Sequence, residues 1–340
     1  MTRFLVRRIA LALVSVWGVI TVVFFLTKLI PGDAARVAAG RTATAEQIEL
    51  ARERLGLDKP VLQQYVDFLV GAAQGDLGQS ASTHQSVAHD LAAALPVTLQ
   101  LVVLAMLITL LVAVPLGILA AAHRGRVGDL AVRLIFVLGG GIPVFWLAML
   151  LQWWLASQLG IFPISGAASF GTSVPDVTGL TLVDALVAGD LPAFIDYFQH
   201  LFLPALALSA PFMATVARNV RSTMIGALQT DYVTFAVAKG ASAGRVLFGH
   251  AFRATAGSTL TIVGMQFGWM MGAALLVETV FALPGIGVYL NAAVLNQDTF
   301  AVLGGVLMIG VVFVAASLVV DVLQMLLDPR VRHAQIGARA

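Results

Sequence analysis

Six long apolar stretches dominate this chain of 340 residues and limit what it can fold into. The sequence is 59% hydrophobic and only 11% charged, which is far from the composition of a water-soluble domain. A helix needs about 20 mostly apolar residues to cross a bilayer. Internal Gly and Pro, without alternating ten-residue segments, favour helices over a barrel. The predicted spans are residues 9–30, 97–121, 134–159, 201–216, 257–281 and 301–327.

Basic residues between these stretches predict how the chain is oriented in a membrane. Of the 20 Lys and Arg residues, three precede the first span, three follow the second, five follow the fourth and three follow the sixth. The connections after the third and fifth spans contain none. Because cytoplasmic connections are enriched in Lys and Arg, this bias places both termini and the connection after the fourth span in the cytoplasm.

The spans divide the chain into four segments. The first apolar stretch has the basic start of a signal peptide, but its apolar core is too long for one, so we interpret it as an uncleaved helix. The predicted segments are residues 1–30, a cytoplasmic tail with the first span; 31–96, an extracytoplasmic helical segment; 97–330, the membrane core with a cytoplasmic loop at 229–255; and 331–340, a cytoplasmic tail.

The segment of residues 31–96 is too small for a catalytic domain and is predicted to form a helical lip on the outer membrane face. Thr44 and Gln47 have the spacing of a capping box, for a helix that reaches about Leu55. Pro60 is placed to begin a second helix with one apolar face. A third amphipathic helix is expected over residues 85–95, before Pro96.

The connection of residues 230–253 carries the most informative polar pattern in the chain. It is rich in small residues, which let another surface approach the backbone closely, and Lys239, Arg245 and Arg253 make it basic. The pattern predicts a short docking helix followed by a turn at Gly240, presented to a soluble partner. The residues that we expect to contact this partner are Asp231, Tyr232, Ala236, Ala238, Lys239, Gly240, His250 and Arg253.

This loop resembles the EAA loop of ATP-binding-cassette (ABC) importer permeases, in the form carried by B-type subunits of the dipeptide/oligopeptide (peptide/nickel) branch. Ala236 and Gly240 match the general motif, whereas Thr234 and Phe235 replace its first two positions. The segment from His250 to Arg253 has the form of the peptide branch. In that family the loop forms a coupling helix that sits in a groove of the ATPase subunit.

The resemblance implies an all-α integral membrane protein of six transmembrane helices, with a type I, MetI-like permease core and a small outer helical lip. It implies a permease subunit that forms half of the pathway of an ATP-driven peptide importer in a bacterial inner membrane. The implied partners are a second homologous permease subunit, two ABC ATPase subunits or domains that hold ATP and Mg²⁺, an extracytoplasmic substrate-binding protein, a peptide substrate and membrane lipid, without nucleic acid. The same branch also imports nickel, glutathione, haem and other small solutes.

Several kinds of chemistry are missing from the sequence. The three lysines, Lys28, Lys59 and Lys239, do not have the context of a nucleotide-binding Walker A loop. There is no cysteine, and the six histidines have no metal-ligand spacing. We therefore expect no catalytic residue, no bound cofactor and no metal in this chain, so that ATP hydrolysis would belong to partner subunits.

Some residues inside or beside the spans are candidates for lining or gating the pathway. Glu278 lies near the end of the fifth span, and a carboxylate there needs a partner or a path to water. It would either line the pathway or tie the helix end to the following turn, and we favour the tie. Asp321 allows the same two interpretations. The full set of candidates is Glu278, Pro284, Gly285, Gly287, Pro143 and Asp321.

A function of another class remains open at this point, namely an ion-coupled secondary transporter. Such a protein would need charges clustered at mid-membrane, and Glu278 and Asp321 are the only candidates. The connection of residues 160–200 contains four Asp and no Lys or Arg. Its acidity would favour the amino terminus of a peptide, or it would only solvate an outer loop.

Overall fold

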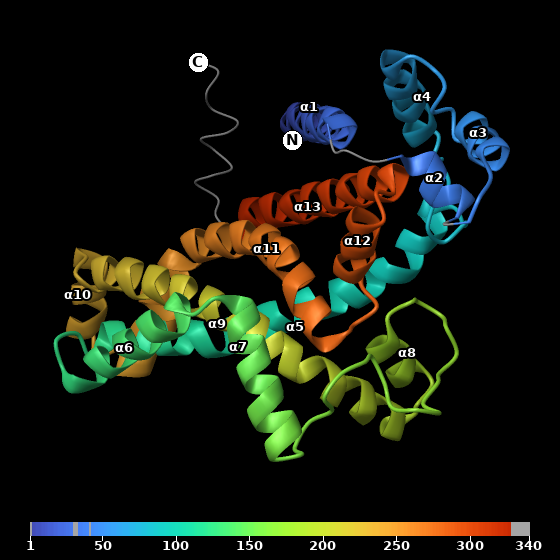
Figure 1. The fold of residues 1–340 in the computed structure, drawn as a ribbon. Coiled ribbons are helices and arrows are strands. Elements are labelled where there is room, and N and C mark those ends of the chain that lie inside the picture. The colour runs from blue at the N-terminus through green and yellow to red at the C-terminus, as the bar shows by residue number, and fades with distance from the viewer. Residues whose placement is uncertain (1, 30–32, 41, 328–340) are drawn as a thin grey trace.

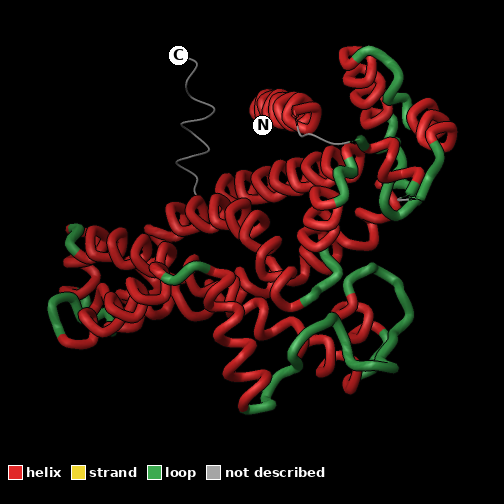
Figure 2. The backbone as a smooth tube through the Cα atoms, in the orientation of Figure 1, coloured by secondary structure: helices red, strands yellow, loops and turns green. Residues whose placement is uncertain are grey.

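The computed structural model describes residues 2–29, 33–40 and 42–327 of the chain. Over these residues the protein is helical and forms no strand (Figure 1, Figure 2). Two stretches, Gln152–Gln158 and Arg245–Phe252, are π-helical. The α-helices are α1 (Thr2–Leu29), α2 (Ala34–Ala39), α3 (Ala45–Arg54), α4 (Val61–Ala73), α5 (Val87–Ala122), α6 (Val127–Gly141), α7 (Val144–Leu151), α8 (Thr181–Val187), α9 (Leu191–Leu228), α10 (Asp231–Ala238), α11 (Arg253–Phe281), α12 (Ile286–Leu295) and α13 (Thr299–Leu327).

Among the described residues, five helical segments are long and apolar enough to cross a membrane. They correspond to five of the six expected spans, and the all-α membrane fold predicted from the sequence is confirmed. The five segments are Ile9–Leu29, Val87–Ala122, Leu191–Leu228, Arg245–Phe281 and Thr299–Leu323.

The third expected span, residues 134–159, is divided in the structure between α6, α7 and the π-helical stretch Gln152–Gln158, with a break before Val144. α6 ends at Gly141, the backbone of Ile142 is extended, and α7 begins after Pro143. A proline disfavours the helical conformation in the residue before it, which fits the extended backbone of Ile142 at the break. Gly140, just before it, packs tightly on α9, because an added Cβ would lie 2.9 Å from the Cβ of Ala214.

Two other boundaries differ from the sequence prediction. The helix expected over residues 85–95 does not end before Pro96 but continues through it as part of α5. The fourth span is much longer than residues 201–216, since α9 runs from Leu191 to Leu228, and it passes through Pro204 and Pro211 without ending. Neighbouring helices can satisfy the backbone groups that a proline frees, so proline is tolerated inside membrane helices.

The lip, which we define as residues 33–86, has the first two predicted helices. Thr44 and Gln47 form the predicted capping box at the start of α3, and Pro60 precedes α4. The lip is bonded to the connection between α12 and α13, because the hydroxyl of Ser80 donates to the carboxylate of Asp298 over 2.6 Å. Asp298 is fully buried and caps α13 through the amide of Ala301.

The centre of the molecule is the pair of long helices α5 and α9, against which α6, α7 and α11 pack. Leu101, Leu203 and Met270 are fully buried in the largest apolar cluster, which joins α5, α9 and α11. α1 lies at the edge and packs on α13, with most of its surface exposed. Figure 1 shows α10 and the lip at opposite ends of the molecule.

Candidate functional site

The predicted docking helix is present as α10, directly after the long helix α9. Thr230 precedes it with an extended backbone and Asp231 opens it. Val233 is the buried residue of α10, at 3% exposure, and anchors the helix to the rest of the protein. α10 contacts the end of α9 and the π-helical stretch Arg245–Phe252, so its position is set by packing against two elements.

Apolar side chains cover much of the free surface of this segment. Phe235 and Val237 of α10 are 61% and 56% exposed, and Phe248 of the neighbouring π-helical stretch is 53% exposed. Tyr232 is 45% exposed, and the ammonium of Lys239 lies 4.4 Å from the ring centroid of Phe235. A group of exposed apolar side chains flanked by charge is typical of a protein contact surface.

The turn after α10 depends on Gly240. Its φ is +82°, a backbone conformation that L side chains rarely adopt, and its amide donates to the carbonyl of Val237. Nothing lies within 4 Å of a Cβ placed on it. The glycine is therefore required by the backbone of the turn, and the space around it is open to another molecule.

The other predicted coupling residues follow this turn or share its surface. Ala236 is half-buried and Ala238 is exposed on α10. His250 lies in the π-helical stretch, and Arg253 is exposed at the start of α11. The eight predicted residues thus lie on α10, in the turn after it, in the π-helical stretch and at the first residue of α11.

Beside this segment, α9 is held to α6 by an ion pair that the sequence analysis missed. The guanidinium of Arg221 donates to both carboxylate oxygens of Asp129, over 2.6 and 2.8 Å. Asp129 is 1% exposed and also accepts the amide of Gly125. The pair joins positions 92 apart in the chain, so no local pattern of residues could reveal it.

At the other end of α11, Glu278 is fully buried and forms the tie that we favoured. One of its carboxylate oxygens accepts the amide of Gly287 over 2.6 Å, which holds the first turn of α12. The hydroxyl of Thr98 on α5 accepts the neighbouring amide of Ile286 over 2.9 Å. Carboxylates are favourable at a helix N-terminus, where amides are free.

The glycines in this turn allow the close approach. A Cβ on Gly285 would collide with the carboxylate of Glu278, and a Cβ on Gly287 would collide with the backbone of Leu275. Pro284 lies in the same turn, after Ala282, whose φ is +52°. Four of the six pathway candidates therefore belong to one compact structure around the start of α12.

The remaining two candidates lie elsewhere. Pro143 marks the break between α6 and α7. Asp321 lies on α13 near Gly264 of α11, since Val320 touches Gly264. Fourteen residues of α11 separate Gly264 from Glu278, which is about 21 Å along a helix. Glu278 and Asp321 thus do not form the mid-membrane cluster that an ion-coupled transporter would need.

Within the described part of the chain, no group of three or more His, Cys, Asp or Glu side chains is arranged to hold a metal ion. The four Asp of residues 160–200 are used within their own loop. Asp184 accepts the amide and hydroxyl of Thr178, and Asp196 accepts those of Ser169. These carboxylates shape the loop.

Comparison with known proteins covers nearly the whole chain. Residues 113–333 match the family of binding-protein-dependent transport system inner membrane components, and residues 1–102 match the N-terminal region of such membrane components. Three relatives align over 98% of this chain. A di/tripeptide transport system permease protein, DppB, of Pseudomonas aeruginosa is 37% identical, with 99% of its length covered. Dipeptide transport system permease proteins, DppB, of Alkalihalophilus pseudofirmus and Escherichia coli are each 34% identical, with 100% and 99% covered.

The match to the family, and the similarity to these relatives over nearly the full length of the chain, agree with the fold. The apolar helices place the chain in the inner membrane as a multi-pass protein, and a permease subunit works in a complex with other transport subunits. The chain therefore belongs to the family of inner membrane components of binding-protein-dependent transport systems.

Proposed function

We propose that this chain is the B-type permease subunit of an ABC importer for di- and tripeptides. The similarity to three peptide permeases over 98% of the chain supports the substrate class. The proposal gives the chain half of the pathway and no covalent chemistry. A second homologous permease subunit would supply the other half, and a substrate-binding protein outside the membrane would deliver the peptide.

The observation that carries the proposal is the exposed apolar surface of α10 and its π-helical neighbour. Two ABC ATPase subunits or domains would hold ATP and Mg²⁺, and one of them would receive Tyr232, Phe235 and Phe248 in a groove. Closure of the ATPases on ATP would move α10 and, through α9, the rest of the permease. The bias of basic residues supports an orientation with α10 and both termini in the cytoplasm.

The test is purification of the intact complex in mild detergent, with mass identification of the bound subunits. We expect an ATPase with a Walker A loop and a second permease, and ATP-dependent uptake of a labelled dipeptide in proteoliposomes. Phe235→Asp should lose the ATPase, because it places a charge in the docking surface. Phe170→Asp is the matched control, since Phe170 is fully exposed on the loop of residues 160–200.

Recovery of the ATPase at wild-type levels with Phe235→Asp would contradict the docking role of α10. Uptake of nickel or another solute, with no competition by dipeptides, would contradict the substrate class while leaving the docking role intact. The two parts of the proposal can therefore fail separately.

A further inference from the structure

Lys28 lies at the end of a membrane span, at the depth where lipid headgroups begin. The apolar segment Ile9–Leu29 of α1 has 21 residues, about 31 Å of helix, which matches a hydrocarbon core of about 30 Å. Lys28 is the penultimate residue of this segment and is half-buried rather than free in solvent. Its ammonium is therefore fixed in the interface on the side of the lip.

The contacts of this ammonium leave its charge unneutralised within the described residues. It donates to the side-chain oxygen of Gln64 over 2.6 Å and lies 5.2 Å from the ring centroid of Phe24. Neither group is a carboxylate. An ammonium has three N–H donors, and Gln64 occupies one of them. The positive charge and two donors remain for another ligand.

Neighbouring cations in the lip are different. Arg52 is paired with Asp33 over 2.7 Å, and Lys59 is paired with Asp67 over 2.7 Å. The sequence thus provides carboxylate partners for two cations of the lip, whereas the described residues provide none for Lys28. A half-buried cation without an internal counter-ion is costly unless an anion from outside pairs with it.

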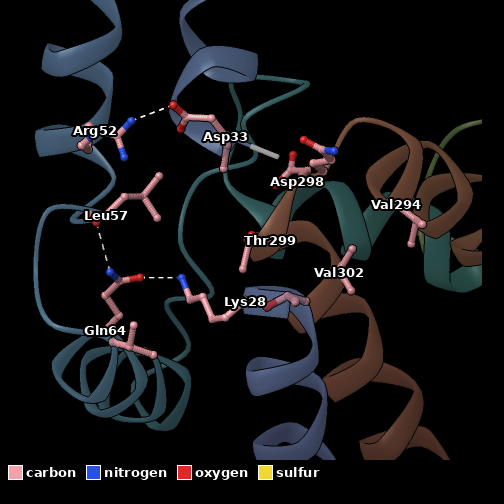
Figure 3. Close-up of a pocket in the computed structure, with 13 residues that line it drawn as sticks. Lys28, Asp33, Arg52, Leu57, Gln64, Val294, Asp298, Thr299 and Val302 are labelled. Carbon is pink, nitrogen blue, oxygen red and sulfur yellow. Dashed lines mark hydrogen bonds and ion pairs between the residues drawn. The ribbon is translucent and has the colours of Figure 1, made fainter. Parts of the chain in front are cut away.

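Open volume lies on both sides of Lys28. A cavity of about 280 Å³ is bounded by the end of α1, the lip and the start of α13 (Figure 3). Its charged lining residues are Lys28, Arg52, Asp33 and Asp298. Asp33 is paired with Arg52, and Asp298 accepts from Ser80 and the amide of Ala301. A second cavity of about 270 Å³ shares Lys28 and Gln64 with the first. The Lys28 side chain therefore lies between two spaces that a ligand can enter.

The surface of α1 beside the cavity suits acyl chains. Leu26 and Leu29, on either side of Lys28 in the sequence, are 52% and 77% exposed, and Phe25 is 43% exposed. α1 packs mainly on α13, so this apolar surface faces the membrane. A molecule bound here would place a polar head in the cavity and apolar tails along α1.

We propose that the cavity binds the phosphate of a glycerophospholipid from the leaflet on the side of the lip. Lys28 pairs with the phosphate, whereas Arg52, which also lines the cavity, stays paired with Asp33. Gln64 accepts from Lys28 and donates to the carbonyl of Leu57, and so joins α1 to the lip. The bound lipid adds to this contact and extends it to the start of α13. This role does not depend on which solute the complex transports.

Lipid retention by the purified intact complex tests this site. Native mass spectrometry would follow adducts of phosphatidylglycerol, with diacylglycerol as the lipid that lacks the phosphate. We expect Lys28→Met to lower phosphatidylglycerol retention about fivefold, the effect of about 1 kcal/mol per basic residue near a lipid surface. Lys59→Met, which removes a paired cation of the same lip, should retain lipid like the wild type, and Lys28→Arg should restore it.

Three results would overturn the proposal. One is equal retention of phosphatidylglycerol by Lys28→Met and the wild type. Another is equal retention of diacylglycerol and phosphatidylglycerol by the wild type, which would mean that the phosphate is not recognised. The third is displacement of the lipid by inorganic phosphate at the same concentration, which would identify a soluble anion as the ligand. Lys28→Arg separates loss of folding from loss of charge, because it keeps the cation.

Discussion

Asp129 and Arg221 form a two-point ion pair between α6 and α9, with the guanidinium nitrogens 2.6 and 2.8 Å from the two carboxylate oxygens. α9 leads directly into α10, and α6 leads into the break at Pro143. The pair therefore connects the helix that carries the docking segment to the interrupted helix. We infer that a displacement of α9 is passed to α6 through this contact.

Removal of one member of this pair is expected to destabilise the complex strongly. Arg221→Gln removes the guanidinium that donates two hydrogen bonds to the buried carboxylate of Asp129, and loss of one partner of a buried pair costs about 3–5 kcal/mol. Arg218→Gln is the control, because Arg218 is exposed and its hydrogen bond among the described residues is a long one, to the hydroxyl of Thr215 at 3.4 Å. Thermal unfolding of the purified complex would measure both variants.

The double variant Asp129→Asn/Arg221→Gln sharpens this test. If the ion pair carries the effect, the double variant should be little worse than Arg221→Gln alone, because the contact between the two residues is already lost in the single variant. Additive losses from the two single substitutions would show that each residue acts through other contacts.

Substitution of Gly240 is expected to uncouple transport from ATP hydrolysis. Gly240→Val strains a backbone with φ of +82° by about 1–2 kcal/mol, without a clash inside the chain. We expect uptake to fall about five- to thirtyfold while the complex keeps its basal ATPase activity. Uptake in proteoliposomes and phosphate release would be measured on the same preparations.

Gly75→Val is the matched control for this substitution. Gly75 lies in the lip with φ of +86°, and it too has nothing within 4 Å of an added Cβ. The backbone strain is then comparable, and only the position differs. Equal loss of uptake in the two variants would mean that general destabilisation, rather than coupling, explains the effect at Gly240.

Glu278 provides a test between a structural tie and a proton-carrying residue. Glu278→Gln keeps an oxygen that can accept the amide of Gly287, so we expect near wild-type uptake. Glu278→Ala leaves that buried amide without its acceptor, which costs about 1–3 kcal/mol and should lower thermal stability. Loss of uptake in a stable Glu278→Gln complex would instead show that the carboxylate takes part in transport.

The sequence alone predicted the features that depend on local pattern. The short helix that begins at Asp231, the turn at Gly240 and the capping box of Thr44 and Gln47 all follow from residue types at short spacing, and the structure contains each of them. The docking role of that helix stays a prediction. Five of the expected spans also correspond to membrane-length helices, because length and apolar composition are sufficient to identify a span.

Features that depend on packing between distant segments were missed or wrong. Pro96 and Pro211 do not end their helices, which is tolerated in membrane helices when other groups bond the freed backbone, whereas α7 begins only after Pro143. The sequence does not distinguish these cases. Thr98 and Asp298 were also missed, because their partners lie 188 and 218 positions away in the chain.

The last prediction concerns pH and the loop of residues 160–200. Hydrogen bonds from Thr178 lower the pKa of Asp184 below its usual value, although burial opposes this shift. A carboxyl group whose pKa is lower in the folded state stabilises the fold above its unfolded pKa, about 3.9, and loses this contribution as the pH falls through its folded pKa. The loop is therefore expected to keep its hydrogen-bonded conformation at neutral pH and to loosen only in acid below about pH 4.

Amide hydrogen exchange at Thr178 across this range would measure the loosening. Asp184→Ala should raise exchange at neutral pH, whereas Asp176→Ala, which removes one bond to the amide of Gly179, should leave Thr178 protected. Loosening of the wild-type loop between pH 5 and 7 would contradict the role of Asp184.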